Sequence, residues 1–423
     1  MAVQDTVAPT PARQDLHSLA MWLRLANTPG VGRHGAFKLL QHYQTPQAVF
    51  TAANARLAAP PAQDDAAPLP LRMLAAADAD SARPDRRFAR ISDAESEISL
   101  EAARSLAGAM PERILALAQA SLEWAAQDGN HLVLLGDPEY PPTLQHIADP
   151  PPLLYAKGRL ELLQREAVAV VGARNATQQG KANARQFAHA LSEAGLLVVS
   201  GLALGIDAAA HEGGLEGVGG TVAVIGTGID RIYPRRNADL ARRVAEEGCL
   251  ISEFPLSTHA RAEHFPIRNR IIAGMTRATL VIEAAAKSGS LITAHAALDA
   301  GRDVYVLPGS VHAPQSVGCH ALIREGGRLV ATPDDLLDDL GLREPGRAGQ
   351  AMQKGQAGLP PVPVDETVGW LLAAIGHDPI GADELATRLQ LAPSDMIASL
   401  LSLELAGVVE RLPGGAFQRL KGP

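Results

Sequence analysis

Six short runs of apolar, largely β-branched residues alternate with stretches of helical character through the middle of this chain. Almost every side chain in these runs is apolar, which is typical of strands that helices cover on both faces. The alternation therefore predicts an α/β domain built on a doubly wound, mostly parallel, Rossmann-like sheet. The runs are VAVVG (168–172), LLVVSG (196–201), TVAVIG (221–226), CLISE (249–253), ATLVIE (278–283) and DVYVLPG (303–309).

The segments before the sheet are expected to form separate parts, because 423 residues exceed what one hydrophobic core organises. Residues 1–15 are rich in Ala, Thr and Pro and predict a disordered leader. Residues 16–111 predict a small N-terminal helical domain, in which 51–110 form a loose Ala/Pro-rich insert. The sheet domain is then expected to span residues 112–341, as an extended Rossmann fold.

The C-terminal part of the chain predicts a winged-helix domain behind a linker. Residues 342–363 are rich in Gly, Pro and Gln, and residues 364–423 show helical segments followed by a hairpin that turns at Gly414–Gly415. The expected recognition helix, SDMIASLLSLELAG, contains Asp395 and Glu404 and no Lys or Arg. Because a helix that binds a duplex needs cations to approach the phosphates, this domain is expected to contact protein or its own chain instead.

Composition excludes several classes of function. The only cysteines are Cys249 and Cys319, so we expect neither a disulfide framework nor a cysteine metal pair. The 13 histidines show no metal-binding spacing, and we assign no metal and no cofactor. The chain has no signal-peptide pattern and no stretch near the roughly 20 apolar residues of a membrane span. We expect a cytoplasmic protein without a membrane partner, whose net charge of −8 still allows a local basic groove.

Glycine ends several predicted strands, at the edge where open α/β sheets bind their ligands. Glycine there lets backbone N–H groups approach phosphate oxygens, and the N-terminus of the following helix adds a favourable dipole. The combination of glycines and cations predicts an anion site, although the same glycines also suit tight turns between strand and helix. The residues concerned are Gly172, Arg174, Ser200, Gly201, Gly205, Gly226, Gly228, Arg235 and Gly309.

Common nucleotide-binding motifs do not account for these glycines. The chain has no GxGxxG that opens a helix and no GxxxxGK[ST] phosphate loop. Asp207 and His211 are spaced i, i+4 and could form an acid/base pair. We favour a structural interpretation, with a helix-capping Asp207 and a hydrogen-bonded core His211.

The stretch EHFPIRNRIIAGMT (263–276) places two arginines directly before an apolar run. Pro266 suits the first position of a helix. Arg268 and Arg270 could form a fork that holds phosphates in bidentate fashion. Alternatively, both arginines could pair with carboxylates such as Glu253 or Glu283, and the sequence leaves this choice open.

Taken together, these stretches strongly resemble the DNA-processing protein DprA (Smf) family. The matching segments run in order from about residue 130 to 335: VGARNAT, VSGLALGIDAAAH, VAVIGTGIDRIYPRRN, SEFP, HFPIRNRIIAGM, VIEAAAKSGSLITA and GRDVYVLPG. The resemblance implies an extended Rossmann fold that holds single-stranded DNA in a positive pocket. It also implies a homodimer that helps to load the recombinase RecA onto incoming DNA during natural transformation, without catalytic activity.

The resemblance also implies a set of DNA-binding residues. Arg174 matches the arginine of the family's Gly-Ser-Arg turn, although Ala173 replaces the serine here. Phe265 lies where the family has an aromatic residue that can contact a base, with Tyr233 as a second stacking candidate. Arg261 stands close to the position of a family lysine, and His320 replaces a usual asparagine. The full set is Gly172, Arg174, Ser200, Gly201, Gly205, Gly226, Gly228, Arg235, Arg261, Phe265, Arg268, Asn269, Arg270, Ser288, Gly289 and Ser290.

The sequence alone leaves three questions about function open. NTPGVGRHGAFKLL (27–40) resembles a helix-hairpin-helix, which can contact a DNA phosphate or serve as a packing element. The same cleft could instead belong to a nucleotide-binding hydrolase related to the phosphoribohydrolases, but PGSVHAPQS stands where their PGGxGTxxE signature would be. The protein could also be a recombination scaffold whose arginine fork supports dimerisation.

Overall fold

The computed structural model describes residues 15–58, 98, 100–342, 371–372, 374–375, 379–412 and 414–420. The chain divides into two compact units, Met1–Leu122 with Asp149–Leu153, and Glu123–Ala148 with Leu154–Pro423. The predicted leader, except for Asp15, and the predicted linker after Leu342 lie outside the described residues. No helix in the described part of the chain is long and apolar enough to cross a membrane.

The first unit is helical, as predicted. Its helices are α1 (Leu16–Ala26), α2 (Gly32–Tyr43), α3 (Pro46–Ala58), α4 (Leu100–Leu106) and the greater part of α5 (Glu112–Ala125). The side chain of Asp15 caps α1 by accepting a hydrogen bond from the backbone N–H of Ser18. The turn between α1 and α2 contains Gly30 and Gly32, both with positive φ, as a helix-hairpin-helix requires.

Two predictions about this unit need correction. Residues 51–110 are not a loose insert at either end, because Ala53 of α3 and Leu106 of α4 are buried. Most of 59–99 lies outside the described residues. The predicted domain boundary at 111/112 precedes α5, whereas the boundary between the units falls inside that helix at 122/123. A continuous helix crosses this boundary, and sequence periodicity gives no sign of where along it the packing changes.

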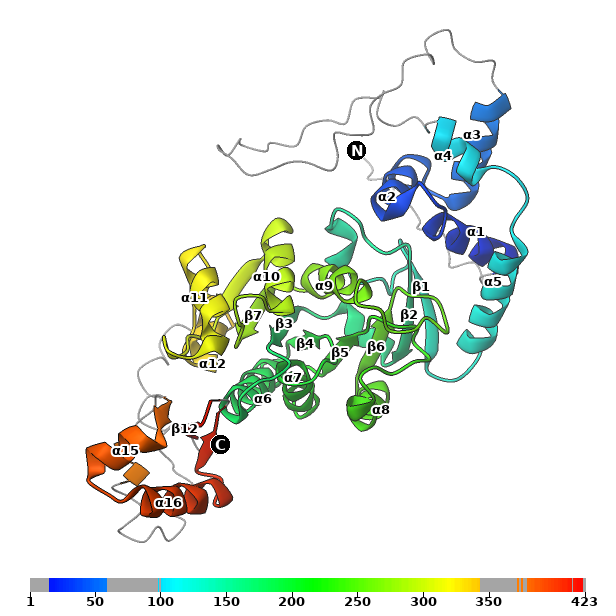
Figure 1. Ribbon diagram of the computed structural model, residues 1–423. Coiled ribbons are helices and arrows are strands. Elements are labelled where there is room, and N and C mark those ends of the chain that lie inside the picture. Colours follow the sequence, from blue (N-terminus) through cyan, green and yellow to red (C-terminus); the bar gives the residue numbers. More distant parts are fainter. Residues whose placement is uncertain are drawn as a thin grey trace. The chain divides into compact units, whose positions relative to one another are not determined.

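The second unit contains the predicted doubly wound sheet (Figure 1). The strand order is β1-β2-β6-β5-β4-β3-β7-β8-β9, and the strands from β6 to β9 in that order are parallel, while β2 runs antiparallel to β6. The order reverses between β3 and β7, which makes their carboxyl ends the switch point of the sheet. The strands are β1 (Asn130–Leu134), β2 (Leu153–Gly158), β3 (Ala167–Gly172), β4 (Leu197–Ser200), β5 (Thr221–Val224), β6 (Cys249–Ser252), β7 (Ala278–Ile282), β8 (Asp303–Val306) and β9 (Arg328–Leu329).

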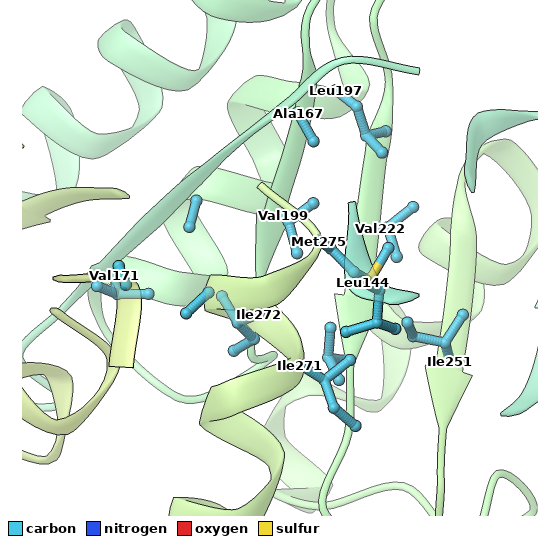
Figure 2. Close-up of a cluster of buried hydrophobic side chains, with 14 of the residues drawn as sticks. Leu144, Ala167, Val171, Leu197, Val199, Val222, Ile251, Ile271, Ile272 and Met275 are labelled. Atoms are coloured by element: carbon cyan, nitrogen blue, oxygen red, sulfur yellow. The ribbon is translucent and has the colours of Figure 1, made fainter. Parts of the chain in front are cut away.

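Helices cover both faces of this sheet, which explains its apolar strands. On one face lie α6 (Gln178–Glu193), α7 (Ile206–Leu215) and α8 (Ala238–Glu247), and on the other α9 (His264–Gly274) and α10 (Gly289–Asp299) (Figure 1). Figure 2 shows the core beneath α9, where Ile271, Ile272 and Met275 meet side chains of the central strands. The remaining helices of this domain are α11 (Val317–Arg324) and α12 (Pro333–Asp339).

The C-terminal domain has the predicted winged-helix elements. They are β10 (Ile380–Gly381), α15 (Ala382–Leu389), α16 (Pro393–Leu405), β11 (Val409–Arg411) and β12 (Ala416–Arg419). The strands form an antiparallel sheet in the order β10-β12-β11. Gly414 and Gly415 turn the hairpin with φ values of 98° and 83°, so the predicted turn is confirmed. Most of the first predicted helix of this domain lies outside the described residues.

Candidate nucleic-acid interface

A cavity of about 650 Å³ opens at the switch point of the sheet. The loop after β3, from Gly172 to Asn175, forms one wall. The first turns of α9 and the start of α10 form the others, through Phe265, Asn269 and the segment 287–290. Loops at the carboxyl ends of adjacent strands converge there because the chain leaves β3 and β7 in opposite directions across the sheet. The predicted location of the site therefore coincides with this cavity at the carboxyl ends of the strands.

An arginine and two aromatic rings lie in series at this cavity. The guanidinium carbon of Arg174 lies 5.4 Å from the ring centroid of Phe265, a cation–π contact. The ring of Tyr233 lies on Phe265 with 5.7 Å between centroids and a 48° tilt. Phe265 is half-buried and Tyr233 is 49% exposed, so each ring keeps surface for a further stacking partner. Arg174 itself is exposed and free to reach a phosphate.

The N-terminus of α10 contributes a second favourable region for an anion. Ser288 caps the helix, and its hydroxyl lies 2.7 Å from that of Ser290. The side-chain amide of Asn269 donates to the carbonyl of Gly289 at 3.2 Å and fixes this turn against α9. The exposed Lys287 directly precedes the helix, where the backbone N–H groups and dipole already attract negative charge. Sequence reasoning missed Lys287, although a lysine before a Ser-Gly-Ser helix start was a usable signal.

The predicted arginine fork is not present in the structure. Arg270 pairs with Glu253 at 2.5 Å, and both side chains are largely buried. Arg268 is only 3% exposed and donates from Nη1 to the carbonyl of Val224 at 2.6 Å. The alternative with Glu253 is thus confirmed for Arg270, while Glu283 instead accepts hydrogen bonds from Thr177. The two arginines point inward because the middle of α9 packs on the sheet.

Arg268 lines the cavity as a buried side chain and is not an exposed cation. Burial lowers the pKa of Arg268 to about 10, while the nearby carboxylate of Asp207 acts in the opposite direction. A Cβ atom added to Gly201 would lie 1.7 Å from Nη1 of Arg268. Gly201 is therefore needed to admit the guanidinium, which is a different role from the predicted approach to a phosphate.

Asp207 and His211 are structural, as favoured from the sequence. Asp207 accepts hydrogen bonds from the backbone N–H groups of Gly201 and Ala203 at 3.2 and 3.4 Å, so it holds that loop rather than capping a helix. His211 accepts from the N–H of Leu202 through Nε2, and Nδ1 lies 2.7 Å from the hydroxyl of Thr221. That hydroxyl donates to the carbonyl of Val198, so Nδ1 carries the proton of a neutral imidazole. Burial lowers the pKa of His211 to about 3, and both residues belong to the core.

The other predicted residues divide between the core and the surrounding surface. Ser200 is fully buried and donates to the carbonyl of Val170, and Gly226 and Gly228 are buried as well. These three residues do not line the cavity. Arg235 and Arg261 are exposed outside it, and Arg261 has Glu263 at 3.8 Å.

The start of α7 supports the loop that carries Arg174. Gly205 has a φ of 83°, and a Cβ atom there would lie 2.3 Å from the carbonyl oxygen of Ala173. Only glycine allows this approach. Gly205 therefore positions the loop that carries Arg174, whereas the sequence predicted that it would contact a phosphate.

Lys181 and Arg236 line a neighbouring hollow that Arg174 also lines. These two cations were not among the predicted DNA-binding residues.

Comparison with known proteins agrees with this architecture. Residues 131–341 match the family model of the DNA recombination-mediator protein A, and residues 356–415 match that of the DprA winged helix domain. Protein Smf of Synechocystis is 37% identical over 327 residues, which cover 70% of this chain and 82% of that protein. DNA processing protein DprA of Streptococcus pneumoniae is 46% identical over 198 residues, covering 47% of this chain and 70% of that protein.

The X-ray structure of DprA from Streptococcus pneumoniae is similar to this chain with a TM-score of 0.50 and 39% identity. The similarity covers 58% of this chain and 88% of that one. The Rossmann-like sheet, the winged helix and the extent of these matches together show that the chain belongs to the DprA (Smf) family.

Proposed function

We propose that this protein binds single-stranded DNA at the cavity between the loop after β3 and the N-terminus of α10. The observation that carries this proposal is the series Arg174, Phe265 and Tyr233, which places a cation beside two rings with exposed surface. Proteins that bind single strands combine cations along the backbone with aromatic platforms for successive bases. Lys287 and the start of α10 add a further attraction for phosphate at the opposite wall.

Single strands suit this site better than duplexes. A ring can stack on a base only when the face of that base is free, and in a duplex neighbouring base pairs cover it. Few cations are needed for such a site, so the net charge of −8 is compatible with the proposal. Phosphate contacts and stacking carry little sequence information, and binding is therefore expected to be largely independent of sequence.

In the cell, the proposed role is to protect imported single strands in the cytoplasm and to assist their loading with RecA during natural transformation. The protein would do so as a homodimer and without catalysis. The geometry of the cavity supports a binding role: among the described residues that line it, Asp207 is the only carboxylate, and its oxygen is engaged by two backbone N–H groups. It is thus poorly placed to act as a general base.

Titration of the intact protein with a fluorescent oligothymidylate and with a duplex of equal length, at several salt concentrations, tests the proposal. We expect tighter binding of the single strand, with an affinity that falls as salt rises. Equal or stronger binding of the duplex would contradict it. Release of free base from nucleoside monophosphates would instead support the hydrolase, and RecA binding without any nucleic-acid affinity would support the scaffold.

A further inference from the structure

A second cationic hollow, of about 460 Å³, lies beside the proposed DNA cavity. Arg174 and Asn175 line both, so the loop after β3 is shared between the two. Lys181 of α6 and the exposed Arg236 add two further cations to the second hollow. In the described part of the chain, no ion pair neutralises either of them. Their charges are thus available to an anion that enters the hollow.

The carboxylate of Glu410 on β11 lies in this hollow, at the start of α6. It accepts a hydrogen bond from the backbone N–H of Gln178, the first residue of that helix, with 2.7 Å between the two atoms. Glu410 is only 9% exposed, and β11 belongs to the same compact unit as α6. The N–H groups and the dipole at a helix N-terminus attract anions. Glu410 therefore occupies a position that suits an anionic ligand.

Glu410 is bound incompletely at this position. Its second carboxylate oxygen, Oε1, is buried and has no hydrogen-bond partner among the described residues, which carries a cost in free energy. The carboxylate of Glu283 is close as well, and it accepts a hydrogen bond from the N–H of Thr177 at 2.9 Å. Burial raises the pKa of Glu283, and the charge of Glu410 acts in the same direction, so the two carboxylates repel each other. An anion with more hydrogen-bonding partners can therefore replace Glu410.

We propose that a single strand bound in the first cavity continues past Arg174 into the second hollow, where one of its phosphates takes the place of the Glu410 carboxylate. The phosphate accepts the hydrogen bond from the N–H of Gln178, and Lys181 and Arg236 bind it and the next phosphate. Glu410 then acts as an internal competitor of the DNA phosphate. The inference rests on the proposed function, because it extends the same site to a longer stretch of DNA.

The shared position of Arg174 identifies the ligand as the strand itself. A polynucleotide carries a phosphate at every nucleotide and can follow both hollows, whereas a free anion fills only one of them. Among the described residues that line the second hollow, four are cationic, including the exposed Arg411, and Glu410 is the only acidic one. This excess of positive charge suits a ligand with several phosphates.

Titration of the intact protein with oligothymidylates of increasing length tests the inference. We expect Lys181→Ala and Arg236→Ala each to lower the salt slope of log K by about 0.7 for a long oligomer, the value for one phosphate contact with a single strand. The loss should disappear when the oligomer is too short to extend beyond the first cavity. Arg242→Ala is the matched control, because Arg242 is 69% exposed on α8 and pairs with Asp239.

The outcomes of this titration separate the inference from the proposed function. Suppose that Arg174→Ala lowers the salt slope, but Lys181→Ala and Arg236→Ala keep the slope of the parent protein at every length. The inference is then overturned and the proposed function stands. If the parent protein binds no single strand at any length, both fail. If Lys181→Ala lowers the slope equally for short and long oligomers, the strand does not pass from the first cavity into the second hollow, and the inference is overturned.

Glu410→Gln tests the exchange of carboxylate for phosphate. The amide keeps the size of the side chain and an acceptor for the N–H of Gln178, but it removes the charge that competes with DNA. We expect it to strengthen the binding of a long oligomer about threefold, the usual effect of one charge at a helix N-terminus, and to leave a short oligomer unaffected. Glu384→Gln is the matched control, because Glu384 is exposed in the same domain and pairs with Arg388. Equal affinity of Glu410→Gln and the parent protein for the long oligomer would refute the exchange.

Inorganic phosphate distinguishes a strand from a free anion as the ligand of the second hollow. Added at constant ionic strength, it should change the Tm of the parent protein no more than that of Lys181→Ala, because a single phosphate lacks the contacts in the first cavity. A Tm that phosphate raises in the parent protein but not in Lys181→Ala would show a site for a free anion, and it would overturn the inference.

Discussion

The guanidinium of Arg174 lies over the ring of Phe265, with 5.4 Å between the guanidinium carbon and the ring centroid. The arginine comes from the loop after β3 and the ring from the first turn of α9, so the sheet brings them together. This contact holds the flexible arginine beside a stacking surface. A phosphate bound by Arg174 and a base stacked on Phe265 would thus belong to the same or adjacent nucleotides.

Replacing Arg174 should weaken DNA binding electrostatically. We expect Arg174→Ala to reduce the affinity for oligothymidylate and to lower the salt slope of log K by about 0.7, the value for one phosphate contact with a single strand. Fluorescence anisotropy at several salt concentrations measures both quantities. Arg242→Ala is the matched control, because Arg242 is 69% exposed on α8 and pairs with Asp239. A salt slope that is the same in Arg174→Ala and the parent protein would remove Arg174 from the site.

Loss of the Phe265 ring should affect binding in a different way. We expect Phe265→Ala to cost about 1–3 kcal/mol of binding free energy, the usual value for one stacked base. The salt slope should stay the same, because no charge is removed. Phe265→Trp should retain most of the affinity in the same titration. If Phe265→Trp loses as much affinity as Phe265→Ala, the ring serves packing rather than stacking.

Arg268 should behave as a core residue despite its charge. We expect Arg268→Met to lower the free energy of unfolding by about 3–5 kcal/mol, because it leaves the buried Asp207 without its opposing charge and the Val224 carbonyl without its donor. Urea unfolding followed by circular dichroism measures this loss, with Arg242→Met as the control. A stable Arg268→Met protein with a reduced salt slope would show instead that Arg268 contacts DNA.

Alanine substitutions at Gly201 and Gly289 should differ in their effect on stability, because only Gly201 is needed for packing. We expect Gly201→Ala to destabilise the domain by about 1–3 kcal/mol, as overpacking does, because the new methyl group meets the Arg268 guanidinium. Gly289→Ala is the counterpart, since no atom lies within 4 Å of the Cβ that it would add. Thermal unfolding of both variants compares them directly. Equal Tm values for the two would mean that the guanidinium can move aside at no cost.

The neutral His211 should make stability depend on pH. Its pKa is about 3 in the folded protein and near 6.5 when unfolded, so protonation below pH 6.5 favours the unfolded chain. Its contribution is therefore complete above pH 6.5 and is lost as the pH falls, by about 1.4 kcal/mol per pH unit at most. Urea unfolding at pH 7.5 and 5 should show a larger loss for the parent protein than for His211→Gln, which cannot titrate. An identical loss in both would contradict the neutral tautomer.

The sequence predicted the strands well because their physical cause is local. Runs such as VAVVG and ATLVIE are apolar on both faces, and only a sheet covered on both sides buries them. The hairpin at Gly414–Gly415 could also be predicted from a local cause, because its turn has two positive φ values and glycine adopts these readily. Pro266 was expected at the first position of the helix, but α9 begins at His264 and Pro266 is its third residue. A proline is also tolerated there, because it still lies in the first turn.

By itself, the sequence determined the fold class, the edge of the sheet where a ligand would bind, and the structural character of His211. Only the tertiary structure decided which cations face that edge. Arg174 and Arg268 have the same chemistry in the sequence, but one follows a strand into solvent and the other lies on the helix face that packs on β5. Side-chain direction depends on how α9 rotates against the sheet, and that rotation is set by long-range packing of Ile271 and Ile272 rather than by residues near the arginines.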